Sequence, residues 1–169
     1  MKISLSIKLG IAAGIINCIA WFFIAQSLGY YSFAVEQYRY YITLLLLLFG
    51  ISISIYFERK NKNGFIQFKE AAKYGVLYTL ALSFILAVFN YIYYQFIIPD
   101  AVDYFVSEAR KSMIEGNLKE EEILKSTEIV KSYFGYFRMF MSTLIFGVIL
   151  SFIAAAILRK KNPLPFSEN

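Results

Sequence analysis

The side chains that could do chemistry in this chain are few, and most of the acidic ones lie in one segment. Asp100 and Asp103 follow Pro99, and a run of three glutamates extends from Glu120 to Glu122. Two carboxylates could hold a cation, but Ca²⁺ takes about 6–8 oxygen ligands, whereas an aspartate beside a proline commonly caps a helix. We interpret the two aspartates as helix-capping residues and the glutamates as a solvated helix face.

Histidine is absent and the chain has a single cysteine, Cys18, inside an apolar run. The chain therefore lacks the commonest general base and metal ligand, and it cannot form an intrachain disulfide. No nucleotide-binding, metal-binding or nucleophile motif appears in the sequence. We predict no catalytic residue, no cofactor site and no metal site, and we expect the protein not to be an enzyme.

Neutral polar side chains inside the apolar runs are the remaining candidates. We expect them to form hydrogen bonds between membrane helices, each contributing about 0.6 kcal/mol. They are Asn17, Gln26, Thr79, Ser83, Asn90, Gln95, Ser142, Thr143 and Ser151. The four apolar runs contain no ionisable residue, which argues against an ion or proton path.

Four long apolar runs define the elements that would carry these residues. The chain of 169 residues is 59% hydrophobic, above the roughly 45–50% of soluble domains, and its mean hydropathy is +0.55. The runs are residues 9–27, 41–57, 74–98 and 139–158, and about 20 apolar residues span a bilayer as a helix. We predict an all-α, polytopic membrane protein with one integral membrane domain over residues 1–169.

The first run could also be a signal peptide, because Ala25-Gln26-Ser27 resembles a cleavage site. The apolar core of a signal peptide is normally about 7–15 residues long, shorter than this run. We therefore favour a retained helix, although the sequence leaves cleavage open.

The segments between the runs have their own patterns. Residues 29–40 form a tyrosine-rich connector, and residues 65–73 have the spacing of a short interfacial helix. Residues 99–138 predict a helical hairpin broken at Gly116-Asn117, which we expect to dock on the outer ends of the membrane helices. Its apolar positions are Val102, Phe105, Val106, Ala109 and Met113 in the first helix, and Ile123, Thr127, Val130 and Phe134 in the second.

Small residues predict where the membrane helices touch. Gly50, Ser52, Gly147 and Ser151 would let neighbouring backbones approach closely. Short matches between residues 8–11 and 73–76, and between residues 48–51 and 145–148, suggest an internal repeat of two hairpins. Chance similarity between apolar helices explains these matches equally well.

The distribution of basic residues predicts the orientation. Arg59, Lys60 and Lys62, then Lys69 and Lys73, and then Arg159 to Lys161 all fall on one side of the predicted spans, as in cytoplasmic loops. We therefore place both termini in the cytoplasm. The net charge of +5 does not indicate nucleic-acid binding, because the cations lie at the ends of apolar runs instead of on one soluble face.

The layout resembles a bacterial membrane-protein family, domain of unknown function 4199. The resemblance rests on the basic loop from Gly64 to Ala71 and Lys73-Tyr74-Gly75, on Asn90 to Tyr94 before Pro99-Asp100, and on the helical loop that follows. It implies a four-helix inner-membrane protein and no known activity or site residue.

On this reading we expect a non-enzymatic membrane component that contacts the lipid bilayer and either a membrane-protein partner or other copies of itself. The alternative is a small transporter, or a transporter subunit, that works as an oligomer.

Overall fold

A computed structural model describes residues 4–160, and these residues form helices and no named strand. Four helices are long and apolar enough to cross a membrane: α1 (Leu5–Leu28), α2 (Phe33–Asn61), α3 (Phe68–Ile92) with the π-helical turn η1 (Tyr93–Ile97), and α6 (Tyr136–Leu158). The helices α4 (Ala101–Glu115) and α5 (Glu120–Tyr133) are short and amphipathic. The predicted fold class is confirmed.

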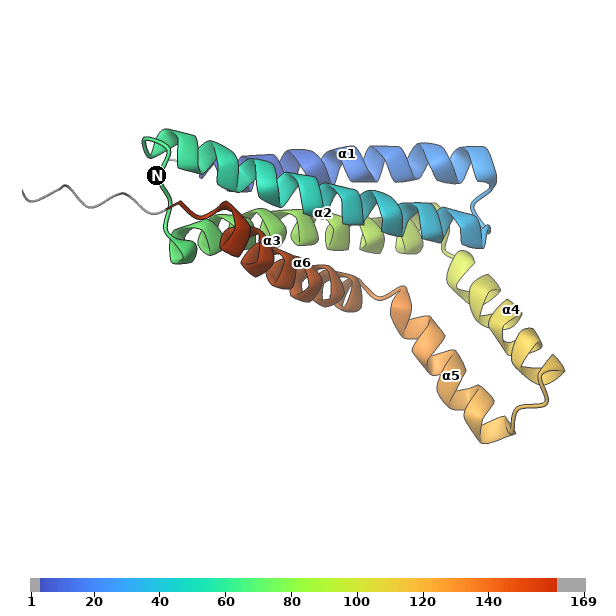
Figure 1. Ribbon diagram of the computed structural model, residues 1–169. Helices are drawn as coiled ribbons and strands as arrows, with labels where there is room; N and C mark the ends of the chain where they lie inside the picture. Colours follow the sequence, from blue (N-terminus) through green and yellow to red (C-terminus); the bar gives the residue numbers. More distant parts are fainter. Residues whose placement is uncertain (1–3, 161–169) are drawn as a thin grey trace, which may run out of the picture.

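The four long helices lie side by side as a bundle (Figure 1). The principal contacts of α3 are with α1, α2 and α6, so this helix is the centre of the bundle. At one end, which we call the basic end, lie the start of α1, the loop from α2 to α3 and the end of α6. At the other end, the hairpin end, α1 turns into α2, and α4 and α5 depart from the bundle (Figure 1).

The membrane helices are longer than the uncharged runs that predicted them. Residues 33–40 belong to α2 and do not form a connector, so Glu36 and Arg39 lie within a candidate membrane helix. Residues 68–73 are likewise the first turns of α3, and the expected separate interfacial helix does not exist. Both helices extend into charged residues, so the length of an uncharged run underestimates the length of the helix.

Glycines and small hydroxyl residues form the closest helix contacts. A methyl group on Gly147 would overlap Thr79 of α3, and one on Gly50 would overlap the ring of Tyr78. Ser151 is fully buried, and its Oγ atom would lie 2.8 Å from a methyl group on Gly75. These contacts confirm the expectation for Gly50, Gly147 and Ser151. Ser52, by contrast, is only half-buried and donates its hydroxyl to Leu48 of its own helix.

A further close contact joins α1 to α3 through Gly10 and Gly14. A methyl group on Gly10 would overlap the Tyr78 carbonyl, and one on Gly14 would lie 2.8 Å from Ile85 Cβ. The G-x-x-x-G spacing that predicts such contacts was present in the sequence and was missed. Gly10 packs against the other hairpin, whereas its supposed counterpart Gly75 packs against α6 of its own hairpin, so these contacts favour chance over an internal repeat.

The basic end is joined by backbone and side-chain bonds. Ile66 and Lys160 each donate a backbone N–H to the other's carbonyl at 3.0 Å, and Arg59 donates to the Leu158 carbonyl at 3.2 Å. Lys62 and Glu70 form an ion pair at 2.6 Å, which raises the lysine pKa. The basic clusters around residues 59–62 and 159–160 therefore lie at one end of the bundle, as the sequence predicted. Lys161 and the tail to Asn169 lie outside the described residues.

The hairpin of α4 and α5 projects from the bundle at an angle, and only its base contacts the membrane helices (Figure 1). The expected docking across the helix ends is therefore wrong. The two predicted apolar stripes lie largely between α4 and α5, where Ile123 is buried, so the two helices cover each other. Asp100 precedes α4 but makes no side-chain cap bond, and our capping assignment is wrong there.

We predict that replacing Gly147 by Leu lowers the thermal stability of the protein in detergent. The larger side chain would force α6 away from Thr79, and overpacking of this kind costs about 1–3 kcal/mol. The control is Ala156→Leu, at an exposed position of the same helix. Equal melting temperatures for the two variants would contradict the close contact between α3 and α6.

Candidate functional site

The neutral polar residues predicted from sequence have different environments. Asn17 donates its amide to Thr43 at 2.8 Å, and the Thr79 and Ser151 hydroxyls lie 3.5 Å apart, so both pairs join different helices. Ser142 bonds only to its own helix, and Gln26 and Gln95 are exposed. The buried Ser83 hydroxyl has no hydrogen-bond partner among the described residues. Hydrogen bonding between helices is therefore confirmed for part of the set.

The richest polar cluster lies at the hairpin end and is built around an ion pair. Glu36 and Arg39 are one helical turn apart in α2, and a Glu36 carboxylate oxygen lies 2.6 Å from an Arg39 guanidinium nitrogen. Tyr94 donates its hydroxyl to Glu36 at 2.5 Å, and Arg39 donates to the Asn90 side-chain oxygen at 3.1 Å. Asn90 is fully buried and donates its amide to the Phe134 carbonyl at 2.8 Å. We call these five residues the polar cluster.

Aromatic rings surround the polar cluster. The Arg39 guanidinium lies over the Trp21 ring, 4.6 Å from its centroid, and this geometry is favourable for a cation and an aromatic face. Phe134 stacks on Phe105 of α4 with ring centroids 5.3 Å apart, and it meets Tyr94 edge to face at 5.0 Å. The polar cluster and these rings thus join α1, α2, the end of α3 with η1, α4 and the end of α5 at Phe134.

The chain continues from α3 into the π-helical turn η1 at this place. The Ile98 N–H bonds to the Tyr93 carbonyl at 3.0 Å, five residues back, which inserts one extra residue into the helical turn. Tyr93 and Tyr94, the first two residues of this turn, are both buried. Such π-helical turns often occur at functional sites.

The geometry of the polar cluster is suited to holding elements together and not to turning over a substrate. Both charged side chains have polar partners within the chain, and the exposed fractions of Glu36 and Arg39 are only 20% and 16%. Catalytic acids and bases need access to a substrate proton, which these carboxylate contacts block. Among residues 4–160, no group of three His, Cys, Asp or Glu side chains could hold a metal ion.

Sequence reasoning missed the polar cluster because it took the uncharged run 41–57 as the whole second helix. Glu36 and Arg39 have the i, i+3 spacing of a helical ion pair, so a longer helix would have suggested their pairing. The contacts with Asn90 and Tyr94 come from residues more than fifty positions away. The sequence carried no signal for these contacts.

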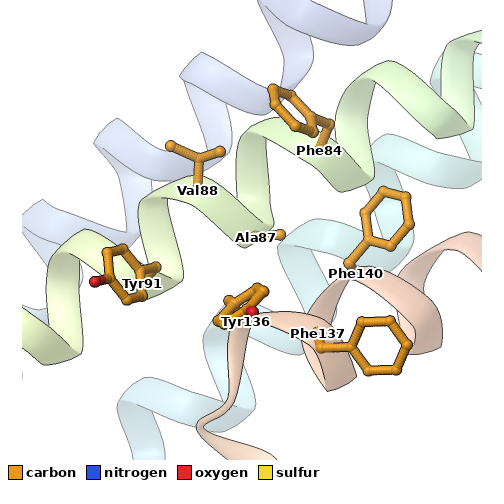
Figure 2. A pocket seen from close by; sticks show the side chains of 7 residues that line it. All are labelled: Phe84, Ala87, Val88, Tyr91, Tyr136, Phe137 and Phe140. Carbon is orange, nitrogen blue, oxygen red and sulfur yellow. The ribbon is translucent and has the colours of Figure 1, made fainter.

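A large hollow lies between α3 and α6, and its lining is mainly apolar. Its volume is about 660 Å³, and Figure 2 shows its seven lining side chains. They are Phe84, Ala87, Val88, Tyr91, Tyr136, Phe137 and Phe140. Only the two tyrosines bring side-chain polar atoms, and their rings meet edge to face at 5.8 Å. In a membrane this surface suits hydrocarbon, and it offers no group for chemistry.

The fold and this site define a helical, multi-pass membrane protein with four candidate spans and a polar cluster at the hairpin end of its bundle. The chain belongs to the family described as "Protein of unknown function (DUF4199)", whose model matches residues 8–160. No curated protein and no solved structure matches the chain. The resemblance seen in the sequence is confirmed.

We predict that Glu36→Gln lowers the free energy of unfolding by about 1.5–3 kcal/mol, because Arg39 then loses a largely buried charged partner. Denaturation in mixed micelles measures this change. The matched control is Glu108→Gln, which breaks an ion pair to Lys111 with the same spacing and the same 2.6 Å distance on an exposed surface. That pair should contribute much less, because water and salt screen exposed charges. If Glu36→Gln lowers the free energy of unfolding no more than Glu108→Gln does, the ion pair of the polar cluster contributes no more to stability than an exposed pair.

Proposed function

We propose that this protein is a non-enzymatic component of a bacterial inner membrane that uses the hairpin of α4 and α5 to bind another membrane protein. The observation that carries the proposal is that this hairpin projects from the bundle (Figure 1). The polar cluster and the stacked Phe105 and Phe134 hold its base. A hairpin held at its base is pre-organised, which reduces the entropic cost of binding a partner.

The surface of the hairpin suggests the chemistry of the partner. Four large apolar side chains are 41–58% exposed although the hairpin is otherwise polar: Ile114, Leu118, Leu124 and Ile129. Glu120 and Glu121 lie beside them and are exposed, whereas Glu122 accepts the Lys119 N–H at 3.3 Å and so caps α5. We infer a partner surface with an apolar centre and basic residues at its rim, the usual arrangement of a protein interface.

Anionic lipid is a poorer candidate for this surface. Helices that bind to a lipid surface carry Lys and Arg along their polar face, whereas acids outnumber cations in this segment.

A photo-reactive residue at Leu124 tests the proposal in native membranes. We expect a discrete cross-linked band with a second protein, and the same probe at Phe152, an exposed position of α6 far from the hairpin, should not give that band. The band should weaken when Glu120 and Glu121 are changed to Lys. Absence of a hairpin-specific band, or a band that this charge reversal leaves unchanged, would contradict the proposed partner surface.

The basic end is proposed to face the cytoplasm and the hairpin the opposite side. Asn63 and Asn117 adopt positive φ angles of 55° and 54°, which cysteine tolerates poorly. Cysteine is therefore better placed at the nearby exposed positions Asn61 and Glu121. In a Cys18→Ala background, a membrane-impermeant thiol reagent applied to intact cells should label Glu121→Cys. Asn61→Cys should be labelled only after the membrane is opened, and its labelling in intact cells would reverse the orientation.

A small oligomeric transporter is the second candidate, and the position of Glu36 and Arg39 within a candidate membrane helix favours it. Ionisable residues at membrane depth commonly mark substrate paths. One bundle of four helices leaves little room for such a path, so transport would require assembly. Cross-linking in membranes separates the two functions, because a strictly monomeric protein contradicts transport and leaves the interaction role standing.

A further inference from the structure

The helices α2 and α6 run parallel and leave a cleft of about 400 Å³ between them at the hairpin end. Both helices advance from the hairpin end to the basic end, so equal steps along each one reach similar depths. In this direction the lining has three levels, which share a common trend and not a uniform chemistry. The first holds Arg39, Tyr40, Tyr133, Arg138 and Met139, the second Thr43, Leu44, Ser142 and Thr143, and the third Leu47 and Phe146. The cleft therefore changes from charged to hydroxyl-bearing to apolar with depth.

A second, apolar hollow lies beyond this cleft, and the buried side chain of Leu47 borders both. This hollow has a volume of about 170 Å³ and lies between the same two helices, nearer the basic end. The other side chains of that hollow include Ile51, Leu150, Ala154 and Leu158. We call the two hollows together the α2–α6 seam: it has a cationic mouth and an apolar groove along the helices.

The mouth of the α2–α6 seam carries positive charge that the described chain does not neutralise. Arg138 forms no salt bridge within residues 4–160, lies 3.6 Å from the Tyr133 ring centroid and donates to the Ser132 hydroxyl. Arg39 is neutralised by Glu36, but its guanidinium has five N–H donors and the observed partners engage only part of them. Arginine donors of this kind suit the paired oxygens of a phosphate.

We propose that the α2–α6 seam binds one anionic phospholipid, with its phosphate at Arg39 and Arg138 and one acyl chain along Leu47 toward Ala154. A phospholipid carries a charged phosphate, then polar ester groups and then hydrocarbon. This order matches the order of the side chains along the seam. Free phosphate would use only the mouth and would leave the groove empty. The volume of the cleft falls within the roughly 300–1,000 Å³ of ligand sites. This site is independent of the partner proposed for the hairpin.

Native mass spectrometry of the full chain in a mild detergent tests this assignment. The probes are phosphatidylglycerol, which is anionic, and phosphatidylcholine, which has no net charge. Both carry the same oleoyl chains, so only their head groups differ. We expect one phosphatidylglycerol to be retained per protein in preference to phosphatidylcholine. Arg138→Gln should weaken phosphatidylglycerol binding about tenfold or more, because a charged hydrogen bond is lost. Ser142→Trp should block the cleft at an exposed position and abolish retention.

The control variant is Arg110→Gln, which removes one positive charge from the exposed surface of α4 and should leave retention unchanged. Melting temperatures near that of the wild type would show that each variant is folded. The assignment is overturned if both lipids bind equally, or if Arg138→Gln and Ser142→Trp retain phosphatidylglycerol as the wild type does. It is also overturned if millimolar inorganic phosphate displaces the lipid completely, because the apolar groove would then contribute nothing.

Discussion

Close contact between backbones around α3 is the constraint on which the rest of the structure depends. Membrane helices gain little from the hydrophobic effect when they associate, because lipid chains are as apolar as their side chains. Van der Waals contact must supply the attraction, and it does so only where small residues let the helices approach. The glycines of α1 and α6 lie against α3 at such points, and α3 is accordingly the most buried of the four candidate spans.

The two ends of the bundle are held together by different contacts. At the basic end, the chain is joined by backbone pairing between Ile66 and Lys160 and by one ion pair, between Lys62 and Glu70. At the hairpin end, the chain must leave the bundle and return to it through α4 and α5. The bond from Asn90 to the Phe134 carbonyl connects the end of α3 to the end of α5, so the polar cluster holds the base of the hairpin.

The sequence predicted the parts of the fold that depend on local composition. Apolar length located all four membrane helices, and Gly116-Asn117 marked the turn of the hairpin, where Asn117 adopts a φ of 54°. Prediction failed where a remote contact decides the outcome. Arg39 is tolerated in a candidate membrane helix only because Glu36, Asn90 and Trp21 surround it, and nothing near position 39 indicates Asn90 or Trp21. The direction of the hairpin likewise depends on Phe105 and Phe134, which meet only in the folded chain.

The openness of the α2–α6 seam follows from how α3 uses its small neighbours. Gly147 of α6 and Gly50 of α2 both make their closest contacts with α3, and Leu47 is the α2 side chain that also reaches Gly147. Larger side chains such as Leu44, Leu47 and Phe146 are left along the line where α2 and α6 approach each other, and these cannot close the gap to backbone contact. A groove between two parallel helices is thus a geometric consequence of packing both against α3. The arginines at its mouth are a separate property of the sequence, and their coincidence with the groove distinguishes this seam from the mainly apolar hollow between α3 and α6.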